Sequence, residues 1–331
     1  MSHIFDALQR LEAERSGTAG SPLPAITELL ERAERGATSR SNVAQELERL
    51  AAADSLERER EREYLPGKPA SVPELELLPE VVPAGEDGNA EILHECRTLH
   101  LSLTPQNRLV TVSDSDSPAA EAFRLLSVRL RHLRRDRNVK KLLITSTIPQ
   151  EGKSTVSANL ACALAASTRR KVLLLEGDVR RPSLSKVFGL ASYPGLCEWL
   201  QGGRSLTSSI YRLEPGGIWL LPAGDGPANP LELLESAKLP ALMKELAALF
   251  DWVIIDSPPV LPLADTSVWT RLADGILLVK RQGITQNRHL QRGLEGLESK
   301  KVIGAVLNSS KSSADNDYYS YRRPPEDSAA N

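Results

Sequence analysis

The stretch "KLLITSTIPQEGKSTVSANLA" at residues 141–161 decides the fold of this chain. It begins with a short apolar run, typical of a buried β-strand, and ends with small and apolar residues at helical spacing. Between the two, "EGKS" supplies a glycine, a lysine and a hydroxyl group. Backbone N–H groups at such a turn and at the start of the helix can surround phosphate groups. The stretch therefore predicts a phosphate-binding loop between a strand and a helix.

Each residue type in this loop suits a part of nucleotide binding. Gly152 lets a phosphate approach the backbone, Lys153 neutralises its charge, and Ser154 can offer its hydroxyl to Mg²⁺. Thr147 departs from the usual pattern, because it stands where a first glycine is expected. We predict a nucleotide-binding set of Thr147, Gln150, Glu151, Gly152, Lys153, Ser154 and Thr155.

Outward from the loop, short apolar runs alternate with amphipathic stretches. The runs predict strands at 140–146, 171–178, 218–224, 252–257, 275–280 and 302–308. The amphipathic stretches predict helices at 118–135, 153–168, 231–249, 264–273 and 286–299. Unbroken apolar strands separated by helices indicate a parallel sheet that is covered on both faces. We therefore predict one α/β domain at 106–312, with a doubly wound, mostly parallel sheet.

Acidic residues stand where two of these strands end. "LLLEGD" leaves Glu176 and Asp178 at one strand end, and "WVIID" leaves Asp256 at another. Ligands of open parallel sheets bind at this edge. Asp256 matches the aspartate that holds Mg²⁺, directly or through water, in phosphoryl-transfer proteins with this loop. An isolated strand-end aspartate is more often a helix cap, but three carboxylates beside a GKS loop indicate a nucleotide site.

Outside this domain the composition is more polar. The chain has 331 residues, 41% hydrophobic content and a formal net charge of −2. We predict a short amphipathic helix at 1–16, a linker or partly disordered extension at 17–105 with a helical stretch at 41–63, and a flexible tail at 313–331. Three exposed tyrosines stand in that tail, at Tyr318, Tyr319 and Tyr321.

The apolar runs and the cysteines limit the cellular location. No apolar run approaches the ~20 residues that span a bilayer, and the N-terminus lacks the apolar core of a signal peptide. The three cysteines are far apart and lack metal-ligand spacing. We therefore expect reduced cysteines in a cytoplasmic protein.

Taken in order, the motifs resemble those of the bacterial tyrosine kinases of polysaccharide export. They are "EAFRLL" (121–126), "EGKSTVSANLA" (151–161), "LLLEGDVRRPSL" (173–184), "FDWVIIDSPPVLPLAD" (250–265) and the terminal tyrosines. The resemblance implies a P-loop fold like that of MinD and ParA. It also implies an autokinase that uses ATP and Mg²⁺, modifies the tail tyrosines of a neighbouring copy, and regulates capsule or exopolysaccharide synthesis and export.

The resemblance further implies roles for individual residues. The catalytic set is Lys153, Glu176, Asp178 and Asp256. Glu176 or Asp178 would take or orient the proton of the tyrosine hydroxyl, while Ser154, Asp178 and Asp256 hold Mg²⁺. Glu121 and Arg124 match the first two positions of the family's oligomerisation pattern.

Partners follow from the same resemblance. We expect a membrane-embedded polysaccharide co-polymerase as activator, a cognate tyrosine phosphatase and further copies of this chain. The activator would hold the otherwise cytoplasmic kinase at the inner membrane.

Three positions depart from the family's pattern. Gln150 stands where a glycine is usual, and a glycine there allows positive φ or close phosphate approach. Glu176 replaces an aspartate and moves the carboxylate out by one methylene. Ser127 stands where the oligomerisation pattern has a second arginine.

Three other interpretations compete. A MinD- or ParA-like ATPase switch usually has a second lysine early in the loop, where this chain has Ile148. A catalytically weak nucleotide-binding scaffold of the export machinery shares every binding feature. The basic run at 129–141 suggests nucleic acid, but no aromatic residues interleave it, so we expect no nucleic-acid partner.

Overall fold

The computed structural model describes residues 92–308, except 168–169, 228 and 262–263. The predicted helix at 1–16, the helical stretch at 41–63 and the three tail tyrosines lie outside the described residues.

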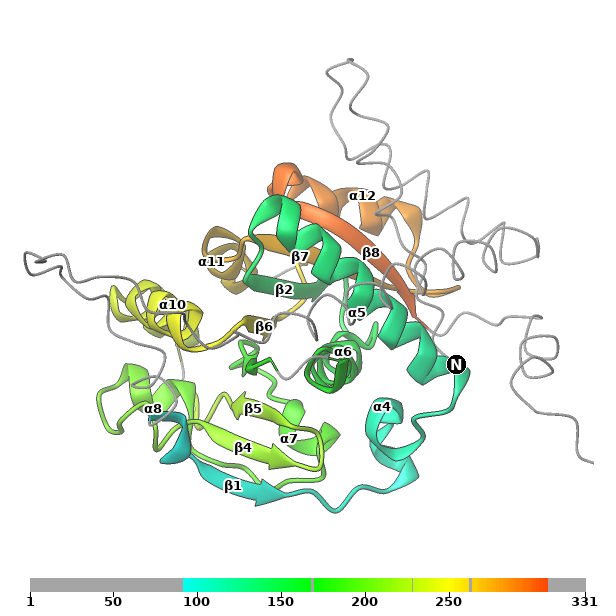
Figure 1. The fold of residues 1–331 in the computed structure, drawn as a ribbon. Coiled ribbons are helices and arrows are strands. Elements are labelled where there is room, and N and C mark those ends of the chain that lie inside the picture. Colours follow the sequence, from blue (N-terminus) through cyan, green and yellow to red (C-terminus); the bar gives the residue numbers. More distant parts are fainter. Residues whose placement is uncertain (1–91, 168–169, 228, 262–263, 309–331) are drawn as a thin grey trace, which may run out of the picture.

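The described chain folds around one eight-stranded sheet, with strand order β1-β4-β5-β3-β6-β2-β7-β8 (Figure 1). The strands are β1 (Arg97–His100), β2 (Lys141–Ser146), β3 (Val172–Glu176), β4 (Tyr211–Glu214), β5 (Ile218–Leu221), β6 (Trp252–Asp256), β7 (Gly275–Arg281) and β8 (Val302–Asn308). Neighbouring strands pair in parallel, except for the antiparallel pair β4 and β5.

Helices cover both faces of this sheet. They are α4 (Val110–Ser113), α5 (Pro118–Arg137), α6 (Lys153–Ser167), α7 (Leu184–Val187), α8 (Leu196–Leu200), α9 (Pro230–Leu234), α10 (Lys238–Leu249), α11 (Asp265–Leu272) and α12 (Asn287–Glu295), with short 3-10 turns η3 (Pro105–Asn107) and η4 (Ser299–Lys301). One core cluster packs α5, α6 and α7 on the sheet, and a second packs α8, α10, α11 and α12 on the opposite face (Figure 1). The predicted doubly wound, mostly parallel fold is confirmed.

The central strands are buried on both sides, which explains their unbroken apolar sequences. Every residue of β3 and β6 is buried. These two strands run side by side, with Glu176 opposite Asp256 in the register. The ends of both strands therefore deliver their carboxylates to one place at the carboxyl edge of the sheet.

The sheet includes residues that precede position 106, the predicted start of the α/β domain. β1 pairs in parallel with β4 at the edge of the sheet. Leu93, Cys96 and Leu99 are buried in the two core clusters. Sequence reasoning missed both β1 and β4 because each has only four residues, of which one is buried in β1 and two are buried in β4.

The predicted helix at 231–249 is instead two helices, α9 and α10. Pro240 is the reason, because a proline inside a continuous helix would lack an N–H group and clash with the carbonyl four residues earlier. Starting the second helix at Lys238 places Pro240 in its first turn, where proline is tolerated. In the part of the chain described, no helix combines the length and apolar character needed to cross a bilayer.

Candidate active site

The loop between β2 and α6 has the backbone shape of a phosphate cradle. Gly152 has φ of +89°, and a Cβ added there would lie 2.1 Å from Asn308 Nδ2. Gln150 also has a positive φ, of 65°, although it is not a glycine. The loop therefore keeps at position 150 the left-handed conformation that a glycine would favour. This conformation costs about 1–2 kcal/mol for a residue that has a Cβ.

One of the predicted loop residues, Glu151, has a side chain that braces the loop from behind. Glu151 is fully buried and accepts hydrogen bonds from Ile148 N at 2.9 Å, from Arg281 N at 3.2 Å and from the Thr285 hydroxyl. Asn308 Nδ2 donates to Glu151 O at 2.8 Å. Glu151 thus ties the loop to β7 through its carboxylate and to β8 through its backbone carbonyl, which leaves its backbone N–H for phosphate.

Thr147 occupies the position of the first glycine because α12 makes room for it. Its side chain is buried, and a Cβ added to Gly293 would lie 2.8 Å from Thr147 Cγ2. The glycine that this loop lacks is therefore replaced by a glycine on the helix that packs against it. Thr155 follows in the first turn of α6 and is partly exposed.

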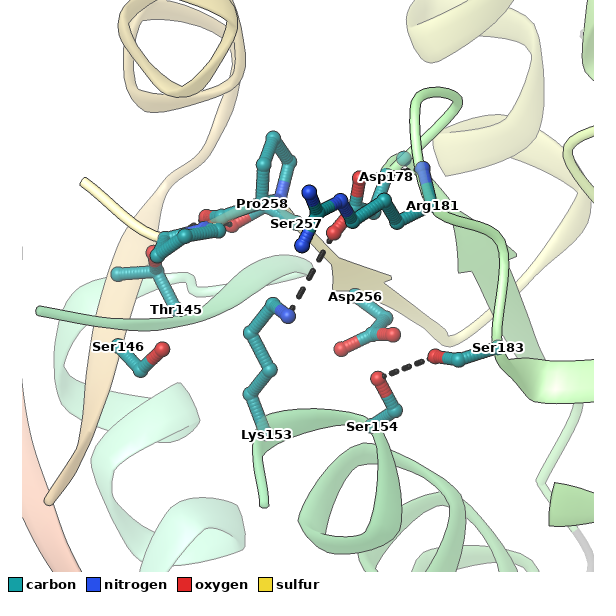
Figure 2. Close-up of polar contacts among 12 residues, drawn as sticks. Thr145, Ser146, Lys153, Ser154, Asp178, Arg181, Ser183, Asp256, Ser257 and Pro258 are labelled. Atoms are coloured by element: carbon teal, nitrogen blue, oxygen red, sulfur yellow. Dashed lines mark hydrogen bonds and ion pairs between the residues drawn. The ribbon is translucent and has the colours of Figure 1, made fainter. Parts of the chain in front are cut away.

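Lysine, hydroxyl and carboxylate groups meet in front of this loop (Figure 2). Lys153 Nζ lies 3.5 Å from Asp178 Oδ2, and both side chains are largely buried. Asp256 lies beside them, and Ser154 Oγ accepts a hydrogen bond of 2.7 Å from Ser183 Oγ. The structure thus brings together Lys153, Ser154, Asp178 and Asp256, which were predicted from sequence as one site.

Asp256 has the environment of a cation ligand. Its Oδ1 accepts a hydrogen bond of 3.0 Å from Ser157 Oγ, while its buried Oδ2 has no hydrogen-bond partner among the described residues. Burial raises the pKa of Asp256 to about 7, against the lowering effect of the nearby Lys153 ammonium. A buried, unpartnered carboxylate oxygen beside a serine hydroxyl belongs to the oxygen donor set that Mg²⁺ prefers, so these residues fit that ion.

Glu176, one of the two candidates for the tyrosine proton, is held by backbone N–H groups. Its Oε1 accepts from Ser183 N at 2.5 Å and Leu184 N at 2.6 Å, and its Oε2 accepts from Ala223 N at 3.1 Å. Burial raises the pKa of Glu176, and these amide contacts oppose the rise. Its carboxylate is occupied in holding backbone, so of the two candidates for the tyrosine proton the geometry favours Asp178.

The segment that carries Asp178 is braced by residues that sequence reasoning missed. Trp269 Nε1 donates to Gly177 O at 3.1 Å, and a Cβ on Gly177 would lie 2.8 Å from the indole. Arg180 makes a two-point contact with the buried carboxylate of Asp265, at 2.5 and 3.1 Å. Asp178 Oδ1 itself accepts from Arg181 N at 3.1 Å. No local motif signals the contacts of Trp269 and Asp265, because they come from α11.

The predicted oligomerisation residues lie together on α5. Arg124 Nε donates to Glu121 Oε2 at 2.7 Å, so the two residues pair within one chain. Ser127 is fully buried and its hydroxyl donates to Arg124 O at 2.7 Å.

Fold and site together define a P-loop nucleotide-binding protein of the α/β class. No family model matches the chain. It is 33% identical over 218 residues to the tyrosine-protein kinase YwqD of Bacillus subtilis, a match that covers 65% of this chain and 92% of YwqD. It is 36% identical over 202 residues to the tyrosine-protein kinase ptk of Acinetobacter johnsonii, which covers 60% of this chain and 27% of that protein. The chain belongs to the family of bacterial tyrosine-protein kinases.

Solved structures agree with this assignment. The kinase domain of the Escherichia coli tyrosine kinase ETK superposes with a TM-score of 0.58 at 32% identity, covering 60% of this chain and 79% of that domain. The chimerical protein CapA2B2 superposes with a TM-score of 0.57 at 28% identity, covering 67% of this chain and 98% of that protein.

Proposed function

We propose that this chain is an ATP-dependent protein-tyrosine kinase that phosphorylates Tyr318, Tyr319 and Tyr321 in the tail of a neighbouring copy. The observation that carries the proposal is the meeting of Lys153, Asp178 and Asp256 in front of a phosphate-binding loop. Family membership supports tyrosine as the acceptor, and the cluster of tyrosines in a polar tail supplies acceptors within the chain itself.

The chain's own groups suit a phosphoryl transfer that depends on position and charge. Loop N–H groups and Lys153 hold the β- and γ-phosphates of ATP. Asp178 receives the tyrosine proton while the bond from Oη to the γ-phosphorus forms and the bond to the β–γ bridging oxygen breaks, releasing ADP. A tyrosine hydroxyl has a pKa of about 10 in water, so a placed carboxylate helps to remove its proton. Mg²⁺, held by Ser154 and Asp256 with Asp178 nearby, would neutralise phosphate charge.

The kinase acts in the synthesis and export of capsule or exopolysaccharide. This part of the proposal rests on the motif resemblance, and so do the partners: a membrane-embedded activator, a cognate tyrosine phosphatase and further copies of the chain. The activator holds the kinase at the cytoplasmic side of the inner membrane. The likeness to the chimerical protein CapA2B2 supports a kinase that works together with a second polypeptide.

The test is mass spectrometry of the purified full chain after incubation with ATP and Mg²⁺, with and without the cytoplasmic segment of a candidate activator. Lys153→Met is compared with Lys186→Met, which changes an exposed lysine on α7. We expect phosphate on the tail tyrosines of the wild type and of Lys186→Met, and none in Lys153→Met. An unmodified tail in the presence of the activator, while ATP is still bound or hydrolysed, would overturn the proposal in favour of an ATPase switch or scaffold.

A further inference from the structure

The hydroxyl of Ser183 is used in an unusual way. Ser183 stands at the N-cap of α7, where a serine side chain commonly accepts a hydrogen bond from the first turn of its helix. Here it makes no such bond. Its Oγ instead points across to the phosphate loop and donates to Ser154 Oγ at 2.7 Å (Figure 2). The contact joins two segments that lie 29 residues apart in sequence.

The backbone of Ser183 is held in place by Glu176. One carboxylate oxygen accepts from the N–H groups of both Ser183 and Leu184, and the other accepts from Ala223 N. Glu176 is 1% exposed, so water competes little for these bonds. The start of α7 is therefore fixed relative to β3 and β5, and the Ser183 hydroxyl is presented to the loop from a rigid support.

We propose that Ser183 is a positioning residue for the Ser154 hydroxyl, with Glu176 as the anchor that places it. A serine hydroxyl has one proton and two acceptor lone pairs. One lone pair of Ser154 accepts the Ser183 proton, and its own proton can turn to the unpartnered Asp256 Oδ2. The remaining lone pair is then directed into the site as a metal ligand. The inference rests on the metal-binding part of the proposed function and adds a residue that holds the ligand in orientation.

This role also accounts for the glutamate at position 176. Its contacts reach residues on two separate segments, at 183–184 and at 223. A shorter aspartate would have to give up some of these contacts or pull the segments inward. The extra methylene thus serves the support of α7.

The test measures binding of fluorescent ADP to the full chain, with Mg²⁺ and with EDTA, so that no acceptor tyrosine is involved. We expect Ser183→Ala to weaken Mg²⁺-dependent ADP binding about tenfold, the range seen when a group that orients a metal ligand is removed. Binding in EDTA should be unchanged. Ser183→Thr, which keeps the hydroxyl, should restore wild-type values, and Ser185→Ala on the same helix serves as the matched control.

A double-mutant cycle separates positioning from general support. If Ser183 acts through Ser154, Ser183→Ala should have no further effect in a Ser154→Ala background. Equal weakening with Mg²⁺ and with EDTA, additive effects in the cycle, or no effect of Ser183→Ala would each overturn the inference. A chain that binds Mg²⁺–ADP as expected but leaves its tail unmodified would overturn the kinase proposal and leave this inference standing.

Discussion

Asp256 and Gln150 are both held in states that cost free energy in the folded protein. Gln150 has a positive φ, and Asp256 is fully buried, with one oxygen that finds no hydrogen-bond partner in the described part of the chain. Costs of this kind gather at functional sites, where the surrounding structure imposes them. Here Glu151, buried behind the loop, supplies part of that surrounding structure.

Removing the charge at Asp256 should stabilise the nucleotide-free protein at high pH. The pKa of Asp256 in the folded protein, about 7, lies above the ordinary aspartate value of 3.8. The protonated carboxyl group therefore contributes fully to the stability of the folded protein below about pH 4. This contribution is lost as the pH rises through 7. Since each pKa unit corresponds to about 1.4 kcal/mol, the ionised carboxylate at pH 8 costs up to about 4 kcal/mol. We expect Asp256→Asn to raise the free energy of unfolding at pH 8 by about 2–4 kcal/mol.

Urea denaturation at pH 5 and pH 8 measures this effect. The gain should shrink at pH 5, and the same variant should lose Mg²⁺-dependent nucleotide binding. Asp114→Asn, at an exposed position, should show neither effect. A variant that is less stable than the wild type at pH 8 would contradict the account of Asp256.

At the scale of elements, β1 belongs to the kinase domain. Leu99 is 5% exposed and packs in the core cluster that also contains residues of α5 and α6. Its neighbours Thr98 and His100 are exposed, as expected for a strand at the edge of a sheet. The strand is therefore anchored in the core of the domain by one buried side chain, that of Leu99.

Leu99→Ala should lower the free energy of unfolding of the full chain by about 2–4 kcal/mol, because it removes buried methyl groups and leaves a cavity. Thr98→Ala is the matched control on the opposite side of the strand and should change stability by no more than about 0.5 kcal/mol. Chemical denaturation followed by tryptophan fluorescence measures both. Equal effects of the two substitutions would mean that β1 is not held in the core.

Prediction from sequence succeeded for the longer elements of this fold. The helix predicted at 153–168 and the strand at 302–308 match α6 and β8 closely. Prediction from sequence failed where an element is short or where one residue interrupts the apolar spacing of a helix. Four-residue strands such as β4 carry little periodicity, and Pro240 divides a stretch whose apolar spacing alone favours one helix.

At the scale of the whole molecule, the paired side chains of Glu121 and Arg124 bear on assembly. Their side chains are 26% and 37% exposed, and an ion pair of this kind contributes at most about 1 kcal/mol to the stability of one chain. If these residues contact a neighbouring copy, Arg124→Ala should lower the assembled mass in sedimentation and shift the melting temperature by only a few degrees.

Arg137→Ala is the control for this experiment, because it removes an exposed arginine from the last turn of the same helix. It should leave the assembled mass unchanged. Wild type and Arg124→Ala with equal masses would speak against an interface at this end of α5.

The sequence by itself determined the strand–loop–helix unit, the alternation of strands and helices, and the set of charged groups at the strand ends. These features are local. The succession of a glycine, a lysine and a serine, and the spacing of apolar residues, are each contained in a short segment of the sequence. The meeting of Lys153, Asp178 and Asp256 followed because parallel strands end at one edge of a sheet.

Only the tertiary structure decided what each group does there. Asn308 supports Glu151 from 157 residues away, Thr285 binds it from 134 residues away, and Ser183 reaches Ser154 across 29 residues. Gly293 makes room for Thr147 from another helix. Contacts of this kind depend on the order of the strands and the packing of helices against them, and no local pattern in the sequence specifies that packing.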